Sequence, residues 1–384
     1  MNWATTFSKL SRFRREARDI ARDLRFRLFV AGLEERILEG DFGTQAIGNV
    51  VHALGIMGAR SDAVVRYVDI EAERIAGEGE PQHISNISYA FAKLGEKGAV
   101  RWFEELEKES VVQKIVREGN PQAFSNTIWA RAPQEISNTI WAMATMGAEA
   151  RNLVSAIDRK DVVQKLVQEG NLQAIANTIW AMATMGAEAR NLASTVDRKD
   201  VVQKLVQEGT TQNLANTLWA LATMGAEARN FAIAVDRKDV VQKLVEEGSP
   251  QHISNTIWAM ATMGVESRNL AIVVDRKEVV QKLVHEGTPQ NISNTIWAMS
   301  AMKVEYPGLV NGIKGDTERI MRSGSGHNIS NIAYALAELG YFEFEKRVFE
   351  AVAGQVERIA REGNEQALSN ILWSLAVAGR LKEN

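Results

Sequence analysis

Amide side chains recur along the chain at one fixed interval. Five asparagines lie 39 residues apart, and each opens the sequence NTIW or NTLW: Asn138, Asn177, Asn216, Asn255 and Asn294. Related copies of the segment contain Asn49, Asn86, Asn126, Asn331 and Asn370. An amide both donates and accepts hydrogen bonds, so amides held in a regular row would suit the binding of an extended polymer at even intervals.

Three further positions follow the same interval. A glutamine stands four residues before the asparagine in most copies, including Gln173, Gln212, Gln251 and Gln290. A tryptophan stands three residues after it and offers a ring for stacking, at Trp141, Trp180, Trp219, Trp258 and Trp297. The residue three before the asparagine changes between copies, as in Glu135, Asn213, His252 and Asn291. We predict that this variable position reads the ligand while the constant amides hold it.

Composition argues against catalysis and against a bound metal or cofactor. The chain has no cysteine, and its five histidines include no close pair at metal-ligand spacing. The sequence has no nucleophile elbow or phosphate-binding loop, and the carboxylates lie in repeated charged stretches. We therefore expect no catalytic residue, no metal site and no cofactor. The sequence also has no apolar run of the length that a membrane span needs.

The segment that carries the amides is predicted to be a helix with recognisable ends. In EGSPQHISNTIWAMATMG, Ser249 suits the N-cap, Pro250 the first helical position and Gly264 the C-terminal stop. The residues between two such segments form either one long helix or a short helix and a second that starts near the DRKD sequence. Short linkers then force antiparallel helices. The predicted fold is all-α, a right-handed α-solenoid of tandem αα-hairpin repeats with a period of 39 residues and essentially no β structure.

A helical wheel divides the first helix of each repeat into two sides. Residues on the apolar side, expected to face the core, are Ile253, Ile257, Met260, Met263 and Gly264. The polar stripe on the other side holds Gln251, Asn255, Ala259 and Thr262, flanked by His252 and Trp258. Stacked repeats would align these stripes into a ladder of amides.

Each of these features has a structural alternative. The asparagines can pin one repeat to the next through buried hydrogen bonds, and the tryptophans can pack between repeats. The variable position can be unconstrained surface. The charge-balanced DRKDVVQK stretch is expected to form local ion pairs on a solvated face, with phosphate contact by its lysines as the alternative.

The repeated unit is similar to the octotricopeptide repeat. PQHISNTIWAMATMG, LQAIANTIWAMATMG and TQNLANTLWALATMG resemble its signature, Pro-Gln-x-Leu-(Ser/Ala)-Asn-x-Leu-Trp-Ala-x-Ala-x-x-Gly, and the resemblance covers residues 43–379. It implies an α-solenoid that binds single-stranded RNA in an organelle, the mitochondrion or chloroplast, and acts in RNA stability, processing, translation or ribosome assembly. The same resemblance places binding on the helix face that carries Gln251, His252 and Asn255 and their counterparts.

Two functions are compatible with these residues, and neither is an enzyme's. The first is sequence-selective binding of single-stranded RNA, with other proteins of a ribonucleoprotein complex as further partners. The second is an armadillo-like scaffold whose asparagine ladder grips an extended peptide. The net charge of −3 favours the peptide, because phosphate neutralisation by basic residues supplies much of RNA affinity. The repeat signature favours RNA. The residues themselves do not separate an organellar from a cytoplasmic location.

The array is expected to have three parts. Residues 1–40 form a basic amphipathic helical segment, with eight basic and three acidic side chains in residues 1–31, and act as a cap of the array or as a targeting segment. Residues 41–132 are degenerate helical repeats. Residues 133–384 are regular repeats with a C-terminal cap.

A break is predicted near residues 131–133. The sequence SNTIW occurs twice, twelve residues apart, so the unit of Asn126 lacks 27 residues of the repeat. Arg131 occupies a position that is apolar in other copies, where an unpaired buried charge would be costly. Pro133 disfavours a continuous helix through this point. We expect the solenoid to be divided here into two blocks of unequal length.

Overall fold

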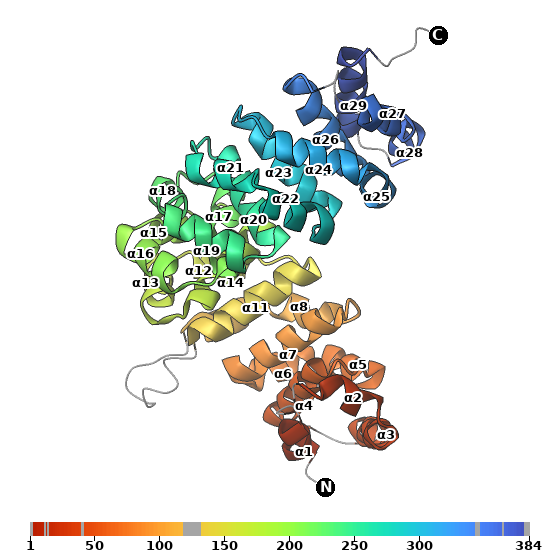
Figure 1. The fold of residues 1–384 in the computed structure, drawn as a ribbon. Coiled ribbons are helices and arrows are strands. Elements are labelled where there is room, and N and C mark those ends of the chain that lie inside the picture. The colour runs from red at the N-terminus through yellow and green to blue at the C-terminus, as the bar shows by residue number, and fades with distance from the viewer. Residues whose placement is uncertain are drawn as a thin grey trace. The chain divides into compact units, whose positions relative to one another are not determined.

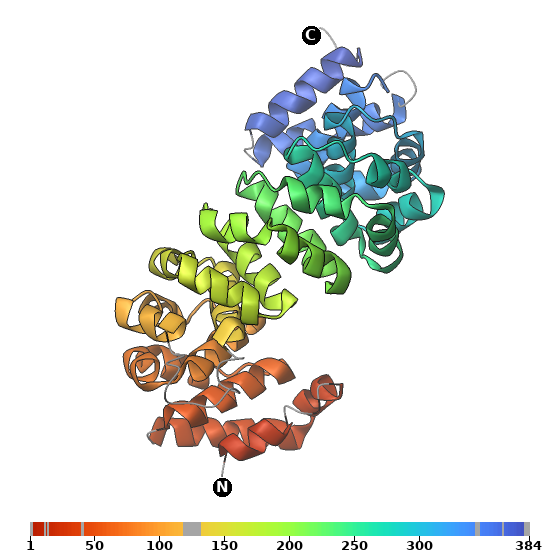
Figure 2. The ribbon, with the colours of Figure 1, turned by 90° about the vertical axis from the view of Figure 1, so that its left-hand side faces the viewer.

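The computed structural model describes the chain except for residues 1–2, 11–12, 14, 40–41, 118–131, 342–345, 363–364 and 380–384. Every regular element in the described residues is a helix (Figure 1), so the all-α prediction is confirmed. The chain falls into two compact units, Met1–Val196 and Asp197–Asn384. Within each unit, helices that follow one another in sequence lie side by side, as a second view also shows (Figure 2).

Each full repeat contains three helices rather than a hairpin of two. In one repeat of the second unit, α17 (Thr211–Thr223) is followed by the short α18 (Arg229–Val235) and then by α19 (Lys238–Glu247). The DRKD sequence forms the turn between the second and third helices, where Arg237 has an extended backbone. Of the two arrangements left open by the sequence, the structure therefore has the pair of shorter helices.

The other helices repeat this order. In the first unit they are α1 (Trp3–Leu10), α2 (Ala17–Arg22), α3 (Leu24–Glu39), α4 (Thr44–Met57), α5 (Asp62–Ile70), α6 (Ala72–Glu78), α7 (Pro81–Leu94), α8 (Val100–Glu105), α9 (Glu109–Arg117), α11 (Ala132–Met146), α12 (Arg151–Ile157), α13 (Lys160–Glu169), α14 (Leu172–Thr184) and α15 (Arg190–Val196). In the second unit they are α16 (Lys199–Glu208), α20 (Pro250–Thr262), α21 (Arg268–Val274), α22 (Lys277–Gln281) with the π-helix η1 (Lys282–Glu286), α23 (Pro289–Ala301), α24 (Pro307–Gly315), α25 (Thr317–Ser323), α26 (Gly326–Glu338), α27 (Lys346–Ala353), α28 (Val356–Arg361) and α29 (Glu365–Val377).

The first helix of each repeat packs against the first helix of the next. In the first unit the order is α1, α4, α7, α11 and α14, and in the second unit it is α17, α20, α23, α26 and α29. Their ends match the sequence prediction: in α20, Ser249 caps the helix through its side chain, Pro250 starts it, and Gly264 follows its end with a φ of +66°. A left-handed conformation at this point suits glycine because it has no Cβ.

A carboxylate from one repeat caps the second helix of the next repeat. Asp236 accepts hydrogen bonds from the backbone N–H groups of Leu270 (2.9 Å) and Asn269 (3.3 Å) and from the Ser267 hydroxyl (2.8 Å). Ser267 itself makes no side-chain cap to α21. The equivalent acceptors in other repeats are Glu107, Asp158, Asp197 and Asp275. The exposed first N–H groups of a short helix are thus satisfied by its neighbour.

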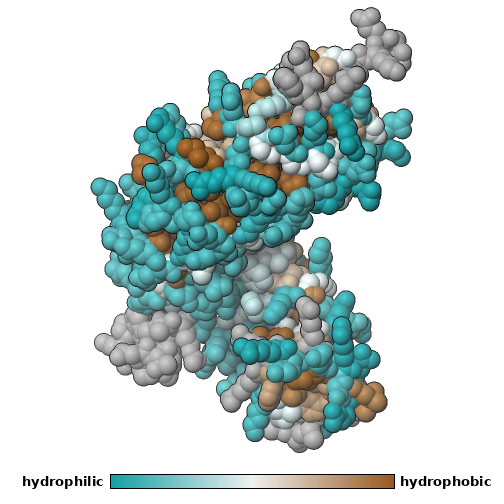
Figure 3. Space-filling view, viewed as in Figure 1, coloured by the Kyte–Doolittle hydropathy of each residue, from teal (hydrophilic) through white to brown (hydrophobic). Residues whose placement is uncertain are grey.

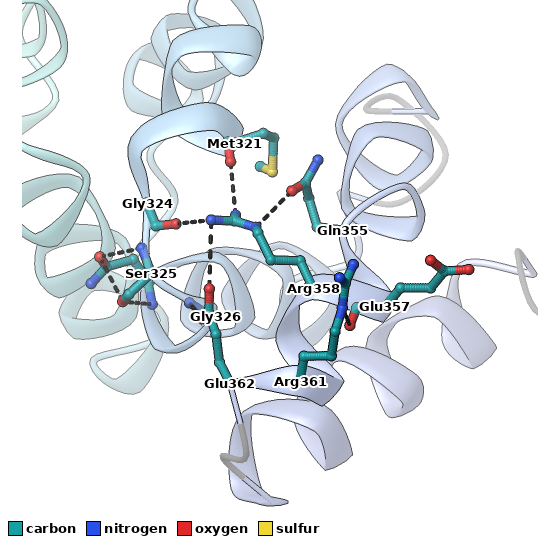
Figure 4. Close-up of polar contacts among 10 residues, drawn as sticks. Met321, Gly324, Ser325, Gly326, Gln355, Glu357, Arg358, Arg361 and Glu362 are labelled. Carbon is teal, nitrogen blue, oxygen red and sulfur yellow. Dashed lines mark hydrogen bonds and ion pairs between the residues drawn. The ribbon is translucent and has the colours of Figure 1, made fainter.

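Basic side chains of the third helices bind backbone carbonyls of the preceding repeat. Arg358 donates to the carbonyl oxygens of Met321 (2.9 Å) and Gly324 (3.1 Å) while Gln355 accepts from its Nε (Figure 4). Lys243 donates to the Gly209 carbonyl at 2.8 Å in the same way. A positive charge at the carboxyl end of a helix also complements the helix dipole. Lys243 is one of the lysines of the DRKDVVQK stretch that the sequence left available for phosphate, and its contact with Gly209 uses it.

Of the predicted break, residue 131 lies outside the described residues, whereas Ala132 and Pro133 are the first residues of α11. The repeat that precedes it is complete, with α7, α8 and α9, and α7 packs directly against α11 as α4 packs against α7. The order of first helices in this unit is therefore not interrupted between α7 and α11. The chain divides into its two compact units between residues 196 and 197, and the break near residues 131–133 stays a prediction.

The N-terminal segment packs as part of the first unit. Helix α1 lies against α4, and the side chains of Phe7 and Leu33 are fully buried. The apolar sides of α1 and α3 therefore pack on α4 and α5, and whether residues 1–40 act as a cap or as a targeting segment stays a prediction. None of the described helices combines the length and the apolar character that crossing a membrane requires.

The carboxylate cap between repeats generates a stability prediction. Replacing Asp236 with Ala leaves two backbone N–H groups and a buried hydroxyl without their acceptor, so unfolding should become easier by about 1–3 kcal/mol. Asp239→Ala, which removes only an exposed ion pair with Arg237, is the matched control and should cost about 0–1 kcal/mol. Urea unfolding followed by circular dichroism compares the two. Equal midpoints for the two variants would contradict the role given to Asp236.

Candidate ligand-binding face

One stripe of the first helices faces solvent in every regular repeat. In α20 it consists of Gln251 and Thr262, which are exposed, and of Asn255 and Trp258, which are half-buried. The same four positions in α17 and α23 hold Gln212, Asn216, Trp219 and Thr223, and Gln290, Asn294, Trp297 and Ala301. None of these residues is charged. In the first unit the stripe includes Gln134, Asn138, Trp141, Gln173, Asn177 and Trp180.

The structure differs from the helical wheel at two positions. Ala259, assigned to the polar stripe, is fully buried, and Trp258 takes its place in the series. The cause is close packing of first helices: a Cβ added at Gly55 would lie 2.6 Å from the Cβ of Ala90, the counterpart of Ala259. Neighbouring repeats thus cover both flanks of a first helix and leave a narrow strip. Met263, assigned to the core, is half-exposed just beyond the helix end.

The constant amides in four consecutive repeats have no partner in the protein. Among the described residues, the side-chain amides of Asn177, Asn216, Asn255 and Asn294 make no hydrogen bond, and neither do those of Gln173, Gln212, Gln251 and Gln290. In α11 the pair is instead linked, because Gln134 donates to Asn138 at 2.8 Å. The alternative that the asparagines pin repeat to repeat is therefore not what the structure has. Their donors and acceptors are available to a ligand.

The aromatic residues of the stripe form rows. The ring centroids of Trp219 and Trp258 are 6.5 Å apart, and those of Trp258 and Trp297 are 6.4 Å apart, with planes tilted by 33° and 36°. A second pair, Tyr334 and Trp373, is 5.0 Å apart. The first unit contains the row His52, Tyr89 and Trp141. The rings thus pack between repeats, as one alternative proposed, while each keeps part of its surface in solvent.

The variable position has a structural role. Asn291 accepts hydrogen bonds from the backbone N–H and hydroxyl of Thr288, both at 3.0 Å, and donates to the Ser254 hydroxyl of the preceding repeat at 3.1 Å. Asn213 closes the same kind of capping box with Thr210, and Asn213 and Asn291 are both buried. The role as ligand reader predicted for Asn213, His252 and Asn291 thus gives way to a structural one. Glu135 is half-buried at the same helical position.

His252 occupies this position in α20 and depends on its neutral form. Its Nδ1 accepts from the backbone N–H of Ser249 at 3.3 Å and lies 3.1 Å from the Thr211 hydroxyl of the preceding repeat. Burial lowers the pKa of the His252 imidazole below its usual range, and the Lys282 ammonium adds to this. Burial lowers the pKa of His83, at the same position in α7, as well.

A sequence signal for this role does exist. Thr210–Asn213, Ser249–His252 and Thr288–Asn291 each place a hydroxyl residue three positions before an amide or imidazole, which is the spacing of a capping box. The variation between asparagine and histidine then has a simple cause. Both side chains accept the N–H of the capping residue, so either one completes the box.

Two asparagines of α23 are predicted to contribute differently to the stability of the fold. Asn291→Ala removes a cap and a buried contact with Ser254, and unfolding should become easier by about 1–2 kcal/mol. Asn294→Ala, three residues on and without a protein partner, should change stability by less than about 0.5 kcal/mol. Thermal unfolding of both variants tests this. If Asn294→Ala were the more damaging change, the assignment of the two positions would be reversed.

The half-buried His252 predicts a pH dependence. The fold favours the neutral imidazole, so the unfolded chain takes up the proton more readily and stability is lost as pH falls through about 6.5, the unfolded pKa of histidine. His252→Asn, the residue found in two neighbouring repeats, should weaken this loss. Unfolding midpoints between pH 8 and pH 5 measure it, with His285→Asn at an exposed position as the control. Parallel pH profiles for the wild type and His252→Asn would rule out the effect.

The chain is similar to a known protein family. A family model described as RNA-editing substrate-binding complex 6 protein matches residues 107–382. The match therefore covers more than two thirds of the chain, and it includes α14, α17, α20 and α23, the first helices that carry the free amides. No curated protein matches the chain.

Proposed function

The chain belongs to the RNA-editing substrate-binding complex 6 protein family, and on that premise we propose that it binds single-stranded RNA as a subunit of an RNA-editing substrate-binding complex. Its partners are then RNA and other proteins of that complex. The role is binding and presentation of RNA without catalysis. The octotricopeptide resemblance, which stays a prediction, supports an organellar location in the mitochondrion or chloroplast.

The free amide ladder is the observation that carries the proposal. Asn216, Asn255 and Asn294 each present an unused donor and an unused acceptor at the same point of three successive repeats. Base edges of single-stranded RNA offer matching acceptors and donors, and bases stack on aromatic rings. In this protein each asparagine lies one helical turn from a partly exposed tryptophan. Unpaired amides beside rings suit unpaired bases better than a regular duplex, whose base edges lie in grooves.

The lack of charge on this face predicts how the affinity for RNA depends on salt. The stripe positions in α17, α20 and α23 carry no charge, and Lys243, Lys282 and Arg319 of the neighbouring third helices are engaged with backbone carbonyls. Binding on this face would therefore rest on hydrogen bonds and stacking rather than on release of counterions from phosphate. Affinity should fall only weakly with added salt.

A peptide-binding scaffold is the second candidate, and the uncharged face favours it. Free amides at one position per repeat can pair with the backbone N–H and C=O groups of an extended peptide, which carries no repeating charge. RNA is preferred because of family membership. A direct binding assay distinguishes the two functions, because only the RNA-binding function predicts saturable binding of RNA.

Removing the ladder tests the RNA proposal. The triple variant Asn216→Ala, Asn255→Ala and Asn294→Ala should lose at least about tenfold in affinity, because each hydrogen bond contributes about 0.5–1.5 kcal/mol. The matched control is Gln203→Ala, Gln242→Ala and Gln281→Ala, which removes three exposed amides from the third helices of consecutive repeats. Fluorescence polarisation with a labelled mixed-sequence single-stranded RNA at about 100 mM salt gives both affinities, and circular dichroism verifies the fold.

The outcomes are distinct. A loss confined to the asparagine variant supports RNA binding on this face, and a shallow salt dependence supports the uncharged contact. Equal losses in both variants would place RNA elsewhere on the protein. No saturable RNA binding by the wild type would remove the proposal and leave the peptide scaffold.

A further inference from the structure

A pocket lined by arginines lies within the first unit. It has a volume of about 640 Å³, and its lining comes from α2 and α3 on one side and from the connection between α4 and α5 on the other. Helix α3 packs on α5, and α2 packs on both α3 and α4, so neighbouring elements hold the walls in place (Figure 1). Val30, Ala31 and Met57 contribute apolar surface to the pocket.

Three of the four charged side chains in the lining are basic, those of Arg22, Arg27 and Arg60. Among the described residues, the side chains of Arg22 and Arg27 have no hydrogen-bond or ion-pair partner. Arg60 is engaged, because its Nε lies 3.0 Å from a carboxylate oxygen of Asp62 and 3.1 Å from one of Glu96. Two guanidinium groups in the lining are therefore left for a ligand.

The acidic side chain of the lining has a structural role. Glu34 accepts a hydrogen bond from the Ser61 hydroxyl at 2.5 Å, and Ser61 caps α5. Asp236 accepts from the Ser267 hydroxyl in the same way at the start of α21. Glu34 thus serves the junction between two helical layers and forms no ion pair with the arginines of the pocket.

The corresponding pocket near the end of α11 has the opposite charge. Its volume is about 660 Å³, and Met146 to Glu149 line it where Met57 to Arg60 line the first pocket. Its charged lining consists of two basic and three acidic residues: Lys97, Arg151, Glu104, Glu107 and Glu149. The position of Arg60 is also glutamate in the next four repeats, at Glu188, Glu227, Glu266 and Glu305. The excess of positive charge therefore belongs to the first pocket and is not a general property of the repeat.

Charge also distinguishes the segment that supplies the two unpaired arginines. Hydrophilic residues cover most of the visible face of the protein (Figure 3), so the signs of their charges separate one part of it from another. Residues 1–31 carry eight basic and three acidic side chains, although the net charge of the chain is −3. Arg27 lies in the first turn of α3, where the helix dipole disfavours a cation. Helix stability thus does not account for this arginine, whereas an anionic ligand would.

We propose that this pocket binds a nucleotide of single-stranded RNA and that Arg22 and Arg27 hold its phosphate. A guanidinium group donates two parallel hydrogen bonds to a phosphate, which an ammonium group does not. The volume is typical of a site for a small molecule and exceeds the needs of a phosphate ion alone. The apolar surface of Val30, Ala31 and Met57 accommodates the ribose and base, and a guanidinium plane also stacks on a base.

The inference rests on the RNA binding proposed above and adds a second, ionic site to it. The amides of the stripe form hydrogen bonds without neutralising phosphate, whereas the two arginines neutralise phosphate and release counterions. Arg22 and Arg27 then carry the salt dependence of the affinity. Two contacts with a single strand correspond to a shallow slope of about −1.4 for the logarithm of affinity against the logarithm of salt concentration.

The double variant Arg22→Gln, Arg27→Gln tests the pocket in the full chain. Fluorescence polarisation with a labelled mixed-sequence single-stranded RNA between about 50 and 200 mM salt gives the affinity and its slope. The variant should lose at least about tenfold in affinity at the lowest salt, and its slope should approach zero. The control is Arg66→Gln, Arg101→Gln, which changes two exposed and unpaired arginines of α5 and α8 outside the pocket and should leave both values unchanged.

The slope separates this inference from the proposed function. The triple variant Asn216→Ala, Asn255→Ala and Asn294→Ala should lose affinity while its slope stays that of the wild type. RNA binding by the wild type with the same slope in Arg22→Gln, Arg27→Gln would overturn the pocket and leave the proposed function in place. Equal changes of slope in the two arginine pairs would also overturn it. No saturable binding by the wild type would remove both.

Crosslinking to the unaltered protein is independent of any effect of the variants on folding. RNA that contains 4-thiouridine should crosslink to residues 21–34 or 57–60, as identified by mass spectrometry of the peptides. Crosslinks confined to other parts of the chain would overturn the pocket as an RNA site.

Two competitors test the identity of the occupant. Uridine monophosphate carries the phosphate, ribose and base of one nucleotide, and a polyglutamate peptide carries as many negative charges as the RNA. Both should displace the labelled RNA much less effectively than unlabelled RNA does. Displacement by either competitor as effective as that by RNA, and lost in Arg22→Gln, Arg27→Gln, would identify a free nucleotide or an acidic peptide as the occupant and would overturn the proposal.

Discussion

The stack depends on helix ends that are satisfied by a neighbouring repeat. A second helix of seven residues is too short to hold itself together, because more than half of its backbone N–H groups have no partner within it. Asp236 supplies acceptors from the repeat before, and Arg358 and Lys243 bind carbonyls in the reverse direction along the third helices. Each repeat is thus incomplete by itself and is completed by its neighbours. Apolar burial provides the bulk of the energy, but these bonds fix the register between repeats.

This packing gives two polar positions of each first helix different roles: the third helical position and the asparagine three residues later. First helices are flanked closely on both sides, so only one strip of each reaches solvent. The side chain at the third helical position points back to the cap and toward the preceding repeat, where Asn291 and His252 are held. Asn294 and Asn255, three residues on, point outward and are left unpaired. The structural bonds between repeats therefore leave the surface amides free for another molecule.

Sequence patterns predicted the local features well and the contacts between repeats poorly. Ser249, Pro250 and Gly264 define a helix because capping and backbone preference act within a few residues, and the 39-residue interval places Gln251, Asn255 and Trp258 on one stripe. The roles of His252 and Asn291 were missed because variation between copies suggested selectivity, although the capping-box spacing was present. Asp236 looked like part of a solvated charge run because its partners lie 33 and 34 residues away. The break at residues 131–133 stays a prediction, and the packing of α7 on α11 could not be predicted from the sequence because it depends on which helices meet in space.

The carboxylate cap has a consequence for how such a chain can grow. The central repeats carry both halves of the junction, the aspartate that caps and the helix end that is capped, so a duplicated unit fits between its parents without any new contact. Gene duplication in steps of one whole period is then structurally silent, which agrees with the near identity of the central repeats.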